Sequence, residues 1–230
     1  MKRFYREATV RRGADGGEVL LDERPVKTPA RRTLALPTAA LAEAVAAEWN
    51  AQGEEVRPQT MPLTGLANAA IDRVAPDEEA FAASLAQYGD SDLVCYRADG
   101  PPSLVARQAA LWDPILAWGR RRYDVDFEIV TGIVHRPQPP ATLARLAHAV
   151  VTRDAFALAA LAPLVTISGS LLIALALAEE AIDSDTAWAA ATLDETWQAE
   201  KWGAVEEATA RLDARRAEFE AAERFLRLLG

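Results

Sequence analysis

The sequence has few of the residues that disulfides and metal sites need. Its 230 residues include one cysteine, Cys95, and two histidines, His135 and His148. A single cysteine cannot form an internal disulfide, which favours a reducing compartment. Neither histidine stands at a metal-ligand spacing, so a structural zinc site is not indicated. We expect no metal and no cofactor.

Nucleotide-binding motifs are also missing. The sequence has no Walker A pattern, and no glycine-rich dinucleotide fingerprint follows a strand. Gly13, Gly16 and Gly17 are typical of a hairpin turn. Ser168-Gly169-Ser170 lacks the spacing of a nucleophile elbow and is better explained as a helix–helix contact. We therefore expect no nucleotide ligand, and the absence of a catalytic motif favours a protein that is not an enzyme.

Positive charge is scarce outside the first residues. The net charge is −9, which disfavours binding to nucleic acid. Residues 1–36 hold nine Lys or Arg and five Asp or Glu, whereas residues 37–230 hold sixteen and twenty-nine. This asymmetry predicts two regions with different surfaces. A basic edge hairpin that resists strand-to-strand aggregation explains the first region without a partner.

No apolar segment follows Met1–Arg6, so we expect no secretory signal peptide. Residues 155–178 carry no charged side chain and are long enough to span a bilayer. Pro163 and the polar Thr166-to-Ser170 stretch interrupt this run, and its flanks lack basic anchors apart from Arg153. We expect a buried pair of helices there, no membrane insertion and a cytoplasmic location.

The hydrophobic pattern predicts an α+β fold. Alternation and turn residues over 3–36 indicate short strands, and 126–131 alternates again. Thr38 can cap a helix that ends near Gly53. We expect a small β-rich N-terminal domain, residues 1–60, which strand 126–131 may join, and a larger all-α domain, residues 61–230.

Further helices are expected from residue 61 onward. Their predicted ranges are 66–75, 77–88, 103–122 with a kink or break at Pro114, and about 204–229, with most of the chain from 141 also helical. In the last helix Val205, Leu212, Phe219 and Leu226 lie seven apart and form an apolar stripe. In the first helix Leu41, Val45 and Trp49 share one face, so we expect Trp49 to be buried and structural.

A stretch rich in tryptophan and carboxylates, residues 194–203, is the strongest functional candidate. Asp194, Gln198 and Trp202 are four apart and share a helical face, whereas Trp197 and Glu200 lie elsewhere. A core helix with solvated acids explains this pattern. A recognition face that combines an aromatic anchor with a charge partner also explains it.

Four stretches, in order along the chain, carry a family resemblance. They are Arg24–Pro29, Ala47–Trp49 with Gln52, Thr60–Thr64 leading to Leu66-Ala67-Asn68, and Trp197-Gln198 to Trp202-Gly203 with Val205-Glu206. Tyr96-Arg97 and Trp112-Asp113-Pro114 agree with them. With these residues the sequence resembles the assembly chaperones for the catalytic head of F-type ATP synthase, the branch that acts on the alpha subunit.

The resemblance implies a soluble, non-enzymatic chaperone that binds the unassembled alpha subunit and prevents its aggregation until it pairs with the beta subunit. It implies a bacterial, cytoplasmic member, with eukaryotic relatives in the mitochondrial matrix. The family's important acidic position falls on Asp194, and the adjacent Glu195 can share its role. The partner-binding residues expected are Asp194, Glu195, Gln198, Trp202 and Glu206.

Two other functions stay open at this stage. One is an enzyme whose carboxylate site is assembled from Asp194, Glu195 and Glu200. The other is a membrane-associated adaptor that uses residues 155–178.

Overall fold

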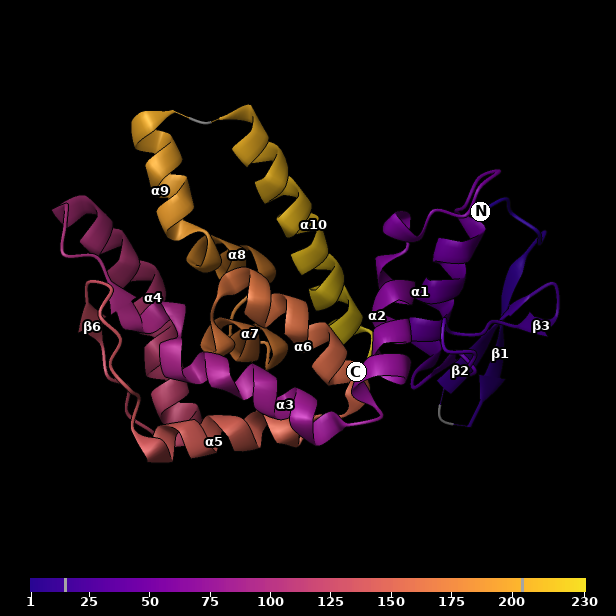
Figure 1. The fold of residues 1–230 in the computed structure, drawn as a ribbon, viewed down its shortest axis with the longest axis horizontal. Coiled ribbons are helices and arrows are strands. Elements are labelled where there is room, and N and C mark those ends of the chain that lie inside the picture. The colour runs from indigo at the N-terminus through magenta and orange to yellow at the C-terminus, as the bar shows by residue number, and fades with distance from the viewer. Residues whose placement is uncertain (15, 204) are drawn as a thin grey trace. The chain divides into compact units, whose positions relative to one another are not determined.

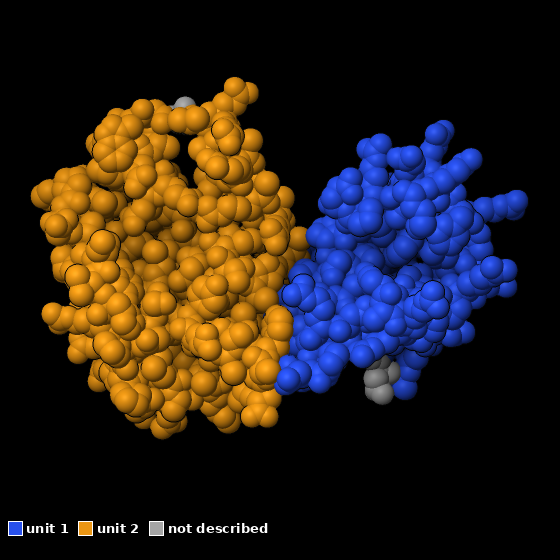
Figure 2. Space-filling model, in the orientation of Figure 1, with its two compact units in different colours: residues 1–78, 154–160, 224–230 blue, residues 79–153, 161–223 orange. Residues whose placement is uncertain are grey.

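The structure is a computed structural model that describes residues 1–14, 16–203 and 205–230. It confirms the expected fold class, with short strands near the N-terminus and mainly helices after them (Figure 1). Contacts group the chain into two compact units, coloured separately in Figure 2. Unit 1 holds residues 1–78, 154–160 and 224–230, and unit 2 holds residues 79–153 and 161–223.

A small antiparallel sheet forms one side of unit 1. Strand β1 (Ala8–Gly13) pairs with β2 (Gly16–Leu21), and β2 also pairs with β3 (Arg24–Pro25) and β4 (Ala35–Leu36). The turn requires glycine at position 16, where φ is +144° and a Cβ atom would lie 2.0 Å from the carbonyl oxygen of Leu36.

Helix α1 (Ala39–Asn50) covers the sheet with its apolar face. The Thr38 hydroxyl accepts a hydrogen bond from the Leu41 amide, which confirms the predicted cap. Leu41 and Val45 are fully buried, but Trp49 is only half-buried and packs at the margin of the core. Elements η1 (Pro58–Thr60), α2 (Pro62–Ala69) and η2 (Ala70–Val74) complete the N-terminal part of unit 1.

Two distant segments of the chain complete the core of unit 1. Residues 154–160 contribute Ala160, and residues 224–230 contribute Phe225, both fully buried. The ring of Phe156 stacks on Phe225 with 6.4 Å between centroids. The Thr38 hydroxyl also donates to the Leu228 carbonyl. Contacts within unit 1 therefore join both ends of the sequence.

The rest of the chain is mainly helical. Its elements are α3 (Glu78–Ala86), η3 (Gln87–Ser91), η4 (Leu93–Cys95), β5 (Tyr96–Arg97), α4 (Pro102–Tyr123), β6 (Val130–Thr131), α5 (Pro140–Val151), α6 (Ala155–Ser168), α7 (Leu171–Ala178), α8 (Ser184–Ala191), α9 (Leu193–Trp202) and α10 (Glu206–Arg227). Helix α4 matches the range expected at 103–122 and is one continuous helix through Pro114, so the predicted break does not occur there.

The uncharged run 155–178 forms two helices, α6 and α7, that separate at Gly169, where φ is +66°. Residues 171–177 of α7 are all buried. Among the described residues no helix is long and apolar enough to cross a membrane. The run therefore supplies protein core, as the sequence predicts.

A buried carboxylate holds the start of α7. Asp92 is fully buried and accepts hydrogen bonds from the Ser170 hydroxyl and from the amides of Leu172 and Val94. Burial raises the pKa of Asp92 to about 6, although these donors act in the opposite direction. Asp92 thus satisfies donors at the start of α7, and Cys95 nearby is fully buried.

The strand expected at 126–131 is shorter than predicted. Only Val130–Thr131 forms a strand, β6, which pairs in parallel with β5 in unit 2 and does not join the N-terminal sheet. The side chain of Gln138 bonds both backbone groups of Glu128 and so replaces further strand pairing there. The domain boundary expected after residue 60 stays a prediction.

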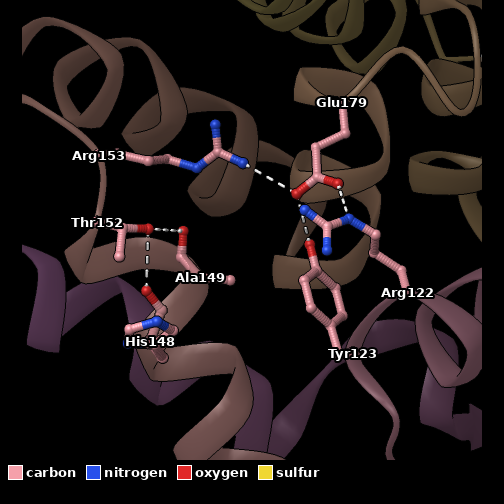
Figure 3. Close-up of polar contacts among 7 residues, drawn as sticks. All are labelled: Arg122, Tyr123, His148, Ala149, Thr152, Arg153 and Glu179. Carbon is pink, nitrogen blue, oxygen red and sulfur yellow. Dashed lines mark hydrogen bonds and ion pairs between the residues drawn. The ribbon is translucent and has the colours of Figure 1, made fainter.

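Glu179, just after α7, ties together the ends of α4 and α5 in unit 2 (Figure 3). Its carboxylate accepts hydrogen bonds from Arg122 Nε at 2.5 Å, from the Tyr123 hydroxyl at 2.9 Å and from Arg153 at 3.3 Å. Burial and the charge of Glu179 raise the pKa of Tyr123. His148, on α5, is exposed.

Candidate partner-binding groove

A groove lies between α9 and α10 in unit 2. Its volume is about 590 Å³. The residues that line it are Glu195, Gln198, Ala199, Trp202, Gly203, Val205, Ala208, Thr209, Arg211, Leu212 and Arg215. Figure 1 shows α9 and α10 running alongside each other at this place, and Figure 2, in the same orientation, shows the surface hollowed between them.

The two tryptophans of α9 have different environments. Trp197 and Leu193, four residues apart, are buried and fix α9 to the core of unit 2. Trp202, in contrast, is 74% exposed and meets the Trp197 ring edge-on with 5.6 Å between centroids. On the other side of the groove Val205 is 65% exposed. The groove thus presents two exposed apolar side chains, Trp202 and Val205, that no described residue covers.

The structure brings together three of the five partner-binding residues expected from the sequence. Glu195, Gln198 and Trp202 line the groove, and all three are exposed. Glu206 opens α10 and is exposed, but it lies outside the lining. The role of each of these residues in binding stays a prediction.

Asp194 faces α4 and does not line the groove. It is half-buried, and its carboxylate accepts a hydrogen bond of 2.9 Å from the side-chain amide of Gln108. Gln108 is itself only 2% exposed and accepts a hydrogen bond from the Ala98 amide. Asp194 is therefore anchored to the core of unit 2, and its helical spacing alone could not reveal this.

Arg215 of α10 lines the groove but was not among the expected site residues. Its guanidinium donates to both oxygens of Glu195, at 2.8 and 3.0 Å, and to the carbonyl of Ile167 at 2.9 Å. The apolar stripe predicted for the last helix was the sequence feature that indicated the groove-lining face of α10. Phe219 of that stripe is buried, whereas Val205 and Leu212 line the groove.

The carboxylates of α9 do not converge on one point. Asp194 bonds Gln108, Glu195 pairs with Arg215, and Glu200 pairs with Arg107 at 2.8 Å. No group of three or more His, Cys, Asp or Glu side chains among the described residues could hold a metal ion. This arrangement offers the groove fixed charges beside an apolar surface and gives no geometric support to a shared carboxylate centre.

Comparisons with protein families, with curated proteins and with solved structures find relatives of the same name. The family model of the ATP12 chaperone protein matches residues 2–120. The mitochondrial protein atp12 of Schizosaccharomyces pombe is 24% identical over 221 residues, which cover 90% of this chain and 75% of that protein.

Solved structures match over the full chain. Atp12 from Paracoccus denitrificans is 44% identical, with a TM-score of 0.94 over 100% of this chain and 98% of that one. An aspartate-to-lysine mutant of the same protein gives 44% identity, the same coverage and a TM-score of 0.95. A chaperone candidate from Agrobacterium tumefaciens is 42% identical with a TM-score of 0.95, over 100% of this chain and 86% of that one.

Proposed function

This chain belongs to the family of ATP12 chaperone proteins, and we propose that it binds the unassembled alpha subunit of the F-type ATP synthase catalytic head. In this proposal it acts without catalysis, prevents aggregation of the subunit and releases it when the beta subunit binds. The observation that carries the proposal is the exposed apolar groove between α9 and α10 in a member of a chaperone family.

The chemistry of the groove suits a chaperone. An unassembled subunit of a ring exposes an apolar surface intended for its neighbour, and such surfaces aggregate. Trp202 and Val205 offer an aromatic and an aliphatic contact to such a surface. Aromatic residues commonly supply a large share of binding energy at protein interfaces.

In this proposal, charged side chains at the groove orient the bound alpha subunit. The Glu195–Arg215 ion pair is partly exposed, and Arg211 is exposed on the same side of α10. Exposed charges at a rim contribute more to encounter rate and register than to affinity. A release step needs such moderate affinity, because the beta subunit must displace the chaperone.

Co-expression tests the proposal directly. The alpha subunit is expressed alone, with this protein, or with a Trp202→Ala variant that removes the aromatic contact. The expected result is soluble alpha subunit that co-purifies with the wild-type protein and is largely lost with the variant. If the alpha subunit stays insoluble beside a well-folded wild-type protein, the proposal is wrong.

An enzyme with a carboxylate site at Asp194, Glu195 and Glu200 was the alternative function. The three side chains contact three different partners, on α4 and α10. This geometry favours positioning roles for them, so we prefer the chaperone. We also propose that no nucleotide or metal is needed, and binding of the two purified proteins in nucleotide-free buffer with EDTA tests this.

The location that we propose is the bacterial cytoplasm. Two of the structural relatives come from bacteria, and the S. pombe relative is a mitochondrial protein. For eukaryotic relatives we propose the mitochondrial matrix. Fractionation of cells that express a tagged full-length chain would test the bacterial location.

A further inference from the structure

Unit 1 contains a second hollow, which the proposed function does not use. Its volume is about 650 Å³. The residues that line it are Met1, Phe4, Tyr5, Leu21, Asp22, Arg24, Pro25, Val26, Lys27 and Trp49. The stretch Arg24–Lys27 among them is part of the family resemblance, yet it takes no part in the groove between α9 and α10.

Aromatic rings form one side of this hollow. Tyr5 is 6% exposed and contacts Phe4 on one side and Trp49 on the other, edge-on in both cases, with centroids 5.5 and 5.6 Å apart. The Tyr5 hydroxyl donates to the Trp49 carbonyl at 2.6 Å, which fixes this arrangement. Phe4 is 66% exposed, so the row of rings continues from the core of unit 1 to the solvent.

Positive charge dominates the rest of the lining. Arg24 and Lys27 are both exposed. Among the described residues that line the hollow, Asp22 is the only acid, and its carboxylate accepts hydrogen bonds from the amides of Arg6 and Glu7. These bonds lower the pKa of Asp22 and keep its carboxylate ionised and occupied by backbone donors. Lys27 donates to the Thr33 hydroxyl at 2.8 Å, and no ion pair of Arg24 or Lys27 is found among the described residues. An incoming group therefore meets apolar rings beside two exposed cations.

From this combination we propose that the hollow binds an acidic peptide segment of a partner protein, with one bulky apolar side chain seated against Phe4, Tyr5 and Trp49. Carboxylates flanking that side chain pair with Arg24 and Lys27. Buried Leu21 and Val26 form the floor, which suits an aromatic or aliphatic group. This inference is independent of the proposed function.

The shape of the site favours a peptide over a membrane surface. Insertion into an anionic bilayer requires protruding apolar side chains, and Phe4 with its basic neighbours offers some of this chemistry. Here, however, two of the three rings line a concavity and are buried or half-buried. A concave apolar site is filled by a side chain that projects from a partner.

The test measures anisotropy of a fluorescein-labelled Glu-Phe-Glu-Leu-Glu peptide with the full-length chain. We expect saturable binding, and at least tenfold weaker binding of Lys-Phe-Lys-Leu-Lys. Phe4→Ala and Arg24→Glu should each weaken binding of the acidic peptide at least fivefold. Both positions are exposed, so these variants should fold.

Matched controls lie elsewhere on the chain. Arg12→Glu changes an exposed arginine of β1 that pairs with Glu43, outside the hollow, and Trp202→Ala changes the other groove. Both should bind the acidic peptide as the wild type does. In an NMR spectrum the indole N–H signal of Trp49, assigned with Trp49→Phe, should shift on titration.

Three results would each overturn the inference. The first is that the acidic peptide shows no saturable binding. The second is that Phe4→Ala and Arg24→Glu bind this peptide as tightly as the wild type does, and the third is that the protein binds anionic phosphatidylserine vesicles but not the peptide. None of these results would contradict the proposal for the alpha subunit, because co-expression with Trp202→Ala tests the groove between α9 and α10.

Discussion

The carboxylate of Asp194 on α9 accepts a hydrogen bond of 2.9 Å from the side chain of Gln108 on α4. Gln108 is almost fully buried, so this contact fixes the start of α9 against the core of unit 2. An acid expected from the sequence to contact a partner therefore also has a structural contact. The partner contact stays a prediction, and the choice of substitution can separate it from this structural contact.

Asp194→Lys should lower the free energy of unfolding by roughly 1–3 kcal/mol, because the buried Gln108 amide loses its acceptor. Asp194→Asn keeps an acceptor oxygen and should cost less than about 1 kcal/mol. Chemical denaturation of both variants measures this. Equal stability of Asp194→Lys and the wild type would show that the contact with Gln108 contributes nothing.

Trp202→Ala should reduce binding of the alpha subunit without changing stability. Trp202 is largely exposed, so the change in unfolding free energy should stay within about 0.5 kcal/mol. An aromatic anchor at an interface contributes on the order of 2 kcal/mol or more to binding, roughly thirtyfold in affinity. Pull-down of the alpha subunit measures the binding. Ile133→Ala is the matched control, because Ile133 is even more exposed and lies outside the groove; a similar loss with it would refute the assignment of the groove.

Trp49→Arg should destabilise unit 1 by on the order of 3 kcal/mol, because it places a charge at the margin of an apolar core. The sequence predicted that Trp49 is buried, whereas the residue is half-buried, and its buried indole nitrogen has no hydrogen-bond partner among the described residues. Trp49→Phe keeps the ring contact with Tyr5 and removes that unsatisfied donor, so it should cost much less. Thermal melting compares them. An unchanged melting temperature for Trp49→Arg would contradict the structural role.

Ionisation of Asp92 should make the protein less stable as the pH rises from about 4 to 6. Its pKa is about 6 in the folded protein and about 3.9 in an unfolded chain. The folded state therefore binds more protons in this window, and about 2–3 kcal/mol of stability is lost across it. Asp92→Asn cannot titrate, so its pH dependence should lack this component. Parallel denaturation curves of the two proteins at each pH measure the difference, and identical pH slopes would contradict the assignment.

Glu179→Ala should lower the free energy of unfolding by roughly 2–4 kcal/mol, because it leaves the half-buried Arg153 and the buried Tyr123 hydroxyl without their acceptor. Glu180→Ala is the matched control, since this neighbouring acid is exposed and Arg153 and Tyr123 donate to Glu179 instead. Urea unfolding compares the two. A loss no larger than that of the control would show that the contacts in Figure 3 are not stabilising.

Local signals in the sequence were sufficient for much of the fold. The Thr38 cap, the hairpin at Gly16 and the uncharged run that becomes α6 and α7 were all predicted, because caps, turns and apolar burial depend on nearby residues. The order of family motifs likewise identified the chaperone family. Strand 126–131 was overestimated, because pairing of a strand depends on a distant partner, here β5.

The candidate site was only partly predictable for the same physical reason. Helical spacing places Asp194, Gln198 and Trp202 near one face of α9, but it does not say which neighbour that face meets. Packing against α4 places Asp194 in contact with Gln108. Trp202, in contrast, lies in the groove between α9 and α10, where both it and Val205 are exposed. The sequence by itself determined the helices, the caps and the family. Only the tertiary structure decided which side chains share a groove, because that depends on contacts between segments far apart in the chain.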